Sequence, residues 1–314
     1  MITELSDEAS EYGRLAQQAL EAAGGDRLAE KAEADPGARE SLVAPVFAEL
    51  GAWDLDPRGS ADEAEAAAAL CRAAGYWAVA YPVAERLARP TDLDTDGLLV
   101  VDGPRPAAGV AGLDLRWVAV DLQGRRSLAT PKPEPSNPRK DAYVVALDLE
   151  PIDEAGQGDL ALGLVLPCWT LLGMLDRAVE LTSQYIVERH QFGKPLAAFQ
   201  GVQFQLTEAE VERAGLTELA KYSLWSIEAG RPEALDDALA LRVAALQAAE
   251  LVFRTAHQLH GAIGFCDETA VSWVSRASVA LRREPFGLAA ARAHLARHLR
   301  HNGLTGLFST DLVR

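Results

Sequence analysis

The chain has 314 residues, 49% of them hydrophobic, which is enough to bury a core in two or three domains or subdomains and excludes a disordered chain. Its formal net charge of −16 repels phosphate backbones and anionic lipid. We therefore expect neither nucleic acid nor a membrane as a partner of the whole chain, while a local basic site stays open.

The N-terminal segment has acidic residues where a signal peptide needs a basic and then an apolar region, so we expect a cytoplasmic protein. The three cysteines, Cys71, Cys168 and Cys266, are odd in number and far apart. This spacing indicates neither a disulfide framework nor a C-x-x-C metal pattern, and we expect all three to be small buried residues.

Residues 1–92 are predicted to form an N-terminal helical unit. The chain there is rich in Ala, Glu, Leu and Arg, and three clusters of Gly, Pro and Asp interrupt it. This pattern indicates about four short helices.

Residues 93–158 are predicted to form a small β unit. Three stretches, 98–103, 113–122 and 142–150, alternate or run apolar between Gly and Pro and are typical of strands. The four prolines within 129–140 indicate a loop. We expect mostly antiparallel pairing.

Residues 159–314 carry no further strand pattern and are predicted to form an antiparallel four-helix bundle with short links. Phe199 and Phe204 are expected in its core. The predicted helices are 160–188, 196–229, 233–259 and 285–300, the last with Pro285 at its first position.

The histidines raise the question of a metal site. His257 and His260 lie three residues apart, and His294, His298 and His301 follow along the last helix. No Asp or Glu completes a ligand set at matching spacing, so we predict no metal.

Two polar joints within the bundle, RHQFGKPLAAFQGVQFQL (189–206) and QLHGAIGF (258–265), carry the most specific signal. The Gly193-Lys194-Pro195 turn lacks the Gly-rich segment and the Ser or Thr of a phosphate-binding P-loop. Arg189 on its own also fits a purely structural role, in which it complements the dipole at the end of its helix.

Together the two joints resemble the acyl-CoA dehydrogenase family, closely over about residues 160–300 and faintly before them. The resemblance implies a mainly α, acyl-CoA dehydrogenase-like fold with truncated helical and β units ahead of the bundle. In the family the joints lie at a subunit interface and hold the ADP half of an FAD whose isoalloxazine ring sits in the other subunit.

The resemblance also implies the cofactor contacts. Arg189 would meet the pyrophosphate in a bidentate charge-assisted pair, Phe192 would pack beside the adenine end, and Gln258 would form hydrogen bonds. Gly261 would let the backbone approach the nucleotide closely. Ala262 departs from the second glycine of the family motif. The predicted FAD-binding set is Arg189, Gln191, Phe192, Gln258, Gly261 and Ala262.

The family's chemistry needs a carboxylate within reach of the proton α to a thioester. Aligned on the family motif, Pro285 occupies the usual position of that base, and Gly163 occupies the position used by a minority of members. Glu284, next to the first position, is the weak candidate. In a purely structural interpretation, Glu284 is an acid before a proline that starts a helix.

A chain without a base, with a β unit about half the family's length, resembles the short subunit of the heteromeric acyl-CoA dehydrogenases of actinobacteria. This resemblance implies an α2β2 assembly with a longer catalytic subunit, an acyl-CoA substrate (favoured: a steroid side chain) and an acceptor such as an electron-transfer flavoprotein. The isolated chain would be inactive. Two alternatives stay open: a self-sufficient homo-oligomeric dehydrogenase using Glu284, and a helical assembly or regulatory protein without flavin.

Overall fold

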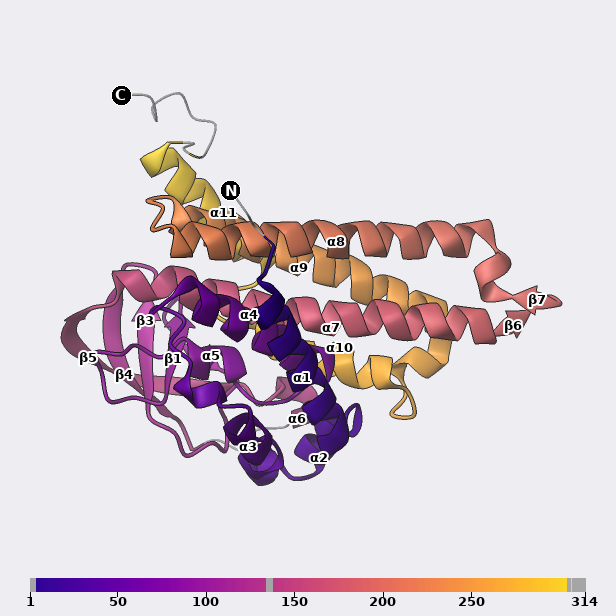
Figure 1. Cartoon of the computed structure of the whole chain (residues 1–314), viewed down its shortest axis with the longest axis horizontal. Helices are drawn as coiled ribbons and strands as arrows, with labels where there is room; N and C mark the ends of the chain where they lie inside the picture. The colour runs from indigo at the N-terminus through magenta and orange to yellow at the C-terminus, as the bar shows by residue number, and fades with distance from the viewer. Residues whose placement is uncertain (1–3, 134–137, 304–305, 307–314) are drawn as a thin grey trace.

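The computed structural model describes residues 4–133, 138–303 and 306. Its helical bundle extends beyond a smaller mass of short helices and one sheet, which lie together at one end (Figure 1). The N-terminal helices begin with clear caps, since Ser6 and Ser60 accept hydrogen bonds from the backbone of α1 and α4. These helices are α1 (Asp7–Ala23), α2 (Arg27–Ala34), α3 (Arg39–Glu49), α4 (Ala61–Tyr76) and α5 (Val83–Leu87).

One five-stranded sheet has the order β1-β3-β4-β5-β2. All its neighbouring pairs are antiparallel except β1 and β3, which pair in parallel with Leu99 opposite Ala119. The predicted strands therefore exist, but β2 and β4 lie in stretches without a strand prediction, and the pairing is mixed. The strands are β1 (Gly97–Val101), β2 (Ala107–Ala108), β3 (Trp117–Asp121), β4 (Arg125–Pro131) and β5 (Val145–Ala155).

Within the described residues, the C-terminal unit contains five long helices rather than the predicted four. The additional helix, α10, is rich in Ser and Val, which have modest helix propensity, although its apolar residues recur at helical spacing. The last helix begins at Leu288, so Pro285 is not its first residue. The interpretation of Glu284 as an acid before a proline that starts the helix is therefore wrong. The helices are α7 (Leu160–Glu188), α8 (Gln200–Glu228), α9 (Ala234–His260), α10 (Ala270–Arg283) and α11 (Leu288–Asn302).

Helix α7 is the centre of the molecule. It packs against α4, α9, α8 and α10, and Trp169 and Leu172 on it are completely buried. It is also long and apolar enough to cross a membrane, but 78% of its apolar window is buried inside the protein. Its apolar character is accounted for by its place in the core.

Two glycines bring α4 and α7 into direct backbone contact. A Cβ atom on Gly173 would lie 1.9 Å from the carbonyl oxygen of Arg72, and one on Gly75 would lie 1.9 Å from that of Thr170. No other residue type fits this joint between the N-terminal helices and the bundle.

Asp159, at the start of α7, joins all three units. Its carboxylate accepts hydrogen bonds from Arg126 of β4 at 2.8 Å and from Arg58 of the N-terminal unit at 3.1 Å. Arg126 and Asp159 are both buried, so their pairing compensates for the loss of hydration. The sheet and the N-terminal helices are thereby held at one end of α7.

Two smaller expectations are wrong. Phe204 is 59% exposed on α8 rather than in the core. Cys266 is exposed directly after the 3-10 helix Gly261–Phe265, whereas Cys71 and Cys168 are buried as expected.

Candidate functional site

The first polar joint forms a small hairpin at the end of the bundle that lies farthest from the sheet (Figure 1). Strands β6 (His190–Gln191) and β7 (Lys194–Pro195) pair across a turn in which Phe192 and Gly193 have positive φ angles of 52° and 80°. A left-handed backbone conformation is uncommon and costly for phenylalanine, so the surrounding turn has to hold Phe192 in it. The ring is 91% exposed.

A groove of about 780 Å³ lies between this hairpin and the turn after α9. Its size falls within the range of about 300–1,000 Å³ that small-molecule sites occupy. All six residues of the predicted FAD-binding set line it: Arg189, Gln191, Phe192, Gln258, Gly261 and Ala262.

Arg189 is the only Lys or Arg among the described residues of the groove wall. Its backbone N–H bonds to the carbonyl of Tyr185 at 2.8 Å and ends α7. Its exposed side chain forms no hydrogen bond or ion pair with any residue that the structure describes. The guanidinium is therefore free to bind an anion. A role limited to capping the helix would not need an unpaired guanidinium in the groove.

Gly261 ends α9 with φ 67° and ψ −146°, a conformation that suits glycine. No described atom lies within 4 Å of the position a Cβ would take there, so the backbone borders open space. The next residue, Ala262, is exposed in the groove wall and leaves that space open. A ligand's phosphate or sugar can approach this turn closely.

Sequence reasoning missed an aromatic wall of the groove. The rings of Tyr185 and His260 stack 4.4 Å apart at 18°, and the Tyr185 hydroxyl donates a hydrogen bond to the carbonyl of His260 at 3.4 Å. Phe199, expected in the core, also lines the groove and meets Phe192 edge-on at 6.3 Å. Tyr185 is recognisable in the sequence only as one residue of an apolar stripe.

Large apolar side chains surround this end of the bundle. Of eight exposed large hydrophobic residues among those described, six belong to the end of α7, the hairpin, the first half of α8 and the turn after α9. Such a concentration is typical of a protein interface. They are Val187, Phe192, Phe204, Val211, Ile263 and Phe265.

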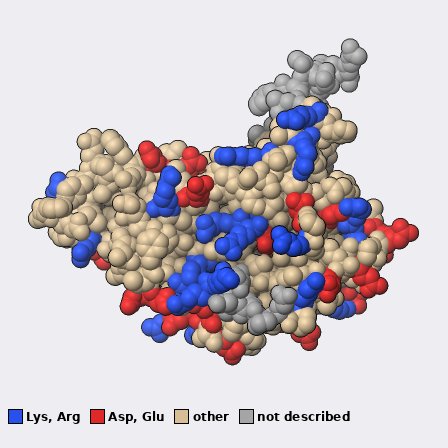
Figure 2. Space-filling view, turned by 180° about the vertical axis from the view of Figure 1, so that it is seen from behind, with Lys and Arg blue, Asp and Glu red and all other residues tan. Residues whose placement is uncertain are grey.

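The back of the molecule carries a run of basic residues on a chain that is acidic overall (Figure 2). Arg283 ends α10, and Arg292 and Arg300 lie on α11. No carboxylate within the described ranges lies within ion-pair distance of these three. The local basic character that the sequence left open is thus present on one face.

The histidines have partners of their own rather than a common one. His257 stacks on Phe265 at 4.3 Å, and His294 and His298 pair with Asp102 and Asp236 at 2.8 and 3.1 Å. Among residues 4–133 and 138–303 no three His, Cys, Asp or Glu side chains are grouped to hold a metal.

Both expected base positions, Pro285 and Gly163, line a second cavity of about 100 Å³ near the sheet. A Cβ atom on Gly163 would lie 2.7 Å from Val100 of β1, so no carboxylate side chain fits there. Glu284 lines the cavity, and burial raises the pKa of its carboxyl above the ordinary value.

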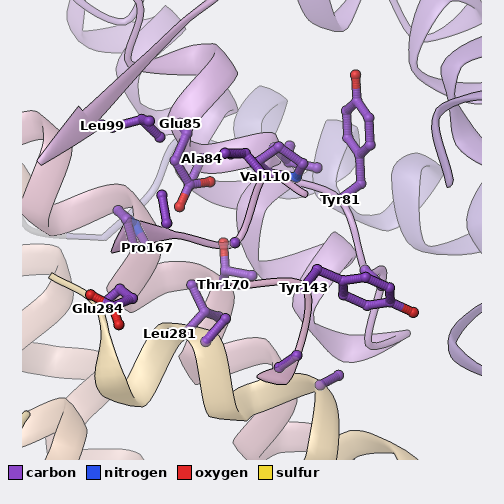
Figure 3. Close-up of a pocket in the computed structure, with 18 of the residues that line it drawn as sticks. Tyr81, Ala84, Glu85, Leu99, Val110, Tyr143, Pro167, Thr170, Leu281 and Glu284 are labelled. Carbon is purple, nitrogen blue, oxygen red and sulfur yellow. The ribbon is translucent and has the colours of Figure 1, made fainter. Parts of the chain in front are cut away.

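Sequence reasoning also missed the second acid of this cavity, Glu85 on α5. Figure 3 shows its side chain extending toward Pro167 and Thr170 of α7, with Glu284 beyond them. Burial raises the pKa of Glu85 to about 7. Glu85 and Glu284 are 199 positions apart, and only the fold brings them to one cavity.

Arg242 of α9 holds the turn that carries Glu284. Its buried guanidinium donates to the backbone carbonyls of Leu281, Glu284 and Phe286 at 2.6, 2.8 and 2.9 Å. These bonds fix the path between α10 and α11, and with it the place where the Glu284 side chain starts.

Comparison with known proteins agrees with this geometry. Residues 157–284 match the family model for the acyl-CoA dehydrogenase C-terminal domain. Helices α7 to α10 therefore match the acyl-CoA dehydrogenase C-terminal domain. The relatives FadE28 and FadE27, acyl-CoA dehydrogenases of Mycobacterium tuberculosis, are 35% and 31% identical over 92 and 137 residues, or 29% and 40% of this chain. An acryloyl-CoA reductase (NADH) of Anaerotignum propionicum is 31% identical over 94 residues, or 30% of this chain. The matched stretches span 27%, 35% and 24% of these relatives' lengths.

Solved structures extend the likeness in fold to nearly the whole chain. The ChsE4-ChsE5 complex from Mycobacterium tuberculosis superposes with a TM-score of 0.74 at 18% identity, over 98% of this chain and 100% of that one. Butyryl-CoA dehydrogenase from Megasphaera elsdenii gives 0.71 at 14% identity, over 96% and 100%. The predicted acyl-CoA dehydrogenase fold is confirmed.

Proposed function

We propose that this chain is the short, non-catalytic subunit of an FAD-dependent acyl-CoA dehydrogenase. A longer subunit would supply the flavin pocket and the catalytic base, in an α2β2 assembly. The complex would desaturate an acyl-CoA between its α and β carbons, with a steroid side-chain thioester as the favoured substrate and an electron-transfer flavoprotein as a suitable acceptor. FAD, when bound, supplies the hydride acceptor for this chemistry.

The observation that carries the proposal is the position of the groove. Arg189 offers an unpaired cation, and Gly261 and Ala262 offer an open backbone turn, which suit the pyrophosphate and sugar of the ADP half. The chain's own sheet lies at the opposite end of α7 (Figure 1). An FAD held here would extend away from that sheet, which supports a second polypeptide around its ring, and the exposed apolar residues around the groove fit such a contact.

The cavity near the sheet supports a non-catalytic role. About 100 Å³ is well below the volume that drug-sized ligands occupy, so a steroid acyl group does not fit in the isolated chain. The bulky substrate would lie in the longer subunit.

The test is to co-express the chain with a longer acyl-CoA dehydrogenase subunit and to measure FAD affinity. Arg189→Ala should weaken FAD binding by about 10- to 100-fold, because a charge-assisted pair is worth about 1.5–3 kcal/mol. Lys194→Ala is the matched control, since Lys194 lies on the same hairpin outside the groove wall and over the Phe199 ring. Unchanged affinity in Arg189→Ala would favour the flavin-free assembly protein.

A self-sufficient dehydrogenase is the second candidate, and one observation favours it. Glu284 lines a cavity, and burial raises the pKa of its carboxyl, as in many general bases. Glu284→Gln should leave the activity of the complex unchanged under the main proposal. A large loss of activity, with FAD still bound, would establish Glu284 as the base.

A further inference from the structure

The turn between α9 and α10, residues 261–269, borders the groove with its first three residues. Gly261, Ala262 and Ile263 line the groove, whereas the other residues of the turn lie outside its wall. The hydroxyl of Thr269 closes the turn by donating a hydrogen bond to the carbonyl of Ile263 at 2.8 Å. The position of the groove's backbone therefore depends on residues that lie outside the groove.

Asp267 holds the outer part of this turn through its backbone and its side chain. Its carbonyl accepts a hydrogen bond from the indole N–H of Trp273 at 2.8 Å. Its carboxylate forms ion pairs with Arg139 at 2.5 Å and with Arg276 at 3.1 Å. The hydrogen bond from Arg139 and the charge of Arg276 hold the pKa of this carboxyl below its ordinary value, so it is ionised at neutral pH.

The same two arginines connect the turn to the N-terminal unit. Arg139 belongs to α6 (Pro138–Asp141), between β4 and β5, and Arg276 belongs to α10. Both also pair with Glu33 of α2, at 2.9 and 3.4 Å. Two acids and two arginines thus form one network, which we call the Asp267 cluster: Glu33, Asp267, Arg139 and Arg276.

The Asp267 cluster is partly shielded from water. The side chains of Glu33 and Arg276 are 16% and 21% exposed, and the Arg276 guanidinium lies over the Trp273 ring at 4.2 Å. Isolated exposed ion pairs contribute little, whereas several charges in one network can fix a geometry. None of the four residues lines the groove, so the cluster acts on a ligand there only through the position of the turn.

We propose that the Asp267 cluster positions the turn 261–269 for the nucleotide, so that α2 and α6 help to shape a groove that they do not line. This inference rests on the proposed function, because it concerns the same FAD site. Asp267 is then a positioning residue, and the contacts with FAD belong to other residues. A general stabilising role is the alternative, and it predicts effects that spread through the whole chain.

The first measurement is amide hydrogen exchange in the full chain, which needs neither FAD nor a partner. The amides of Cys266 and Thr269 form hydrogen bonds within the turn. In Asp267→Asn both should exchange about 3- to 10-fold faster, because the side chain keeps its shape and loses its charge. The amide of Gly230, in the turn after α8, should keep its wild-type rate. Unchanged exchange at Cys266 and Thr269, or equal acceleration at Gly230, would overturn the proposal.

The second measurement is the FAD affinity of the complex with the longer subunit. FAD is an anion, so removal of an acid near its site would tighten binding by charge alone. A turn without its anchor should instead bind FAD more weakly, by about 3- to 10-fold in Asp267→Asn. Asp267→Glu keeps the carboxylate and should retain most of the wild-type affinity. Circular dichroism verifies that each variant is folded.

Glu268→Gln is the matched control for the change in charge. Glu268 is the next residue of the same turn, is exposed, and forms no ion pair or hydrogen bond with any residue that the structure describes. Its replacement changes the net charge as Asp267→Asn does, and it should leave FAD affinity and exchange at the wild-type values. An equal loss of affinity in the two variants would refute a special role of Asp267.

The outcomes separate this inference from the proposed function. Unchanged or tighter FAD binding in Asp267→Asn, together with a loss in Arg189→Ala, would reject the positioning role and leave the proposed function intact. Unchanged affinity in Arg189→Ala would reject the proposed function, and with it the role of the cluster toward FAD. The exchange rates of the full chain would then still show whether the cluster holds the turn.

Discussion

The close contact between α4 and α7 gives the sharpest stability prediction. In Gly173→Ala the new Cβ would lie 1.9 Å from the carbonyl oxygen of Arg72 and 2.8 Å from the amide nitrogen of Tyr76, whereas ordinary contacts begin at 3.4 Å. Both neighbours are backbone atoms, so no side-chain rotation relieves the overlap. The two helices must separate by about 1.5 Å, the difference between the first and last of these distances.

The cost follows from what such a separation disturbs. Overpacking a core costs about 1–3 kcal/mol and sometimes more. Here it also strains the ion pair between Arg72 and Asp176, whose atoms are 2.6 Å apart. We expect the free energy of unfolding to fall by about 3 kcal/mol or more, and the melting temperature by about 6 °C or more.

Urea unfolding followed by circular dichroism measures this change, with Gly215→Ala as the matched control. Gly215 is also a helical glycine, in α8, but no described atom lies within 4 Å of the position that a Cβ would take there. That substitution should stabilise the chain by about 0.5–1 kcal/mol, because alanine is the better helix former. If Gly173→Ala unfolds at the wild-type urea concentration, the two helices are not in backbone contact.

Three further predictions concern buried groups and the groove. Burial raises the pKa of Glu85 from 4.5 to about 7, so the folded chain binds this proton more tightly than the unfolded chain. The free energy of unfolding should therefore fall by up to about 3 kcal/mol as the pH rises from about 4.5 to about 7. Urea unfolding at several pH values measures this loss, and Glu85→Gln should remove it. Arg242→Met should cost about 3 kcal/mol in the same assay, because three carbonyls lose a buried donor; an unchanged midpoint would show that Arg242 does not hold the turn after α10. Gly261→Ala should cost about 1–3 kcal/mol from its backbone conformation and should weaken FAD binding by the complex, measured by fluorescence titration.

The sequence predicts those parts of the fold that depend on local periodicity. Helices α7, α8 and α9 follow their predicted ranges to within a few residues, because long apolar stripes define them. Helix α10 was not predicted although its buried Val271 and Val274 lie at helical spacing; its 14 residues include three Ser and three Val, which have modest helix propensity. The parallel pairing of β1 with β3 depends on contacts between segments distant in the chain.

In the candidate site, too, only the parts that local sequence encodes were predictable. The groove was predictable because its residues lie in two motifs with a family resemblance, whereas the Tyr185–His260 wall joins residues 75 positions apart. The closure of the second base position was not predictable either, since it depends on Val100 packing against Gly163. Glu85 gave no signal because one acid in a short helix resembles any other charged surface residue.

The central claim is that this polypeptide completes a flavin site that belongs mostly to another. The most direct measurement is the flavin absorbance of the chain purified alone and of the chain co-purified with the longer subunit. The account predicts a colourless chain and a yellow complex with about one FAD per pair of subunits. A lone chain that retains a full complement of FAD and oxidises an acyl-CoA would contradict it.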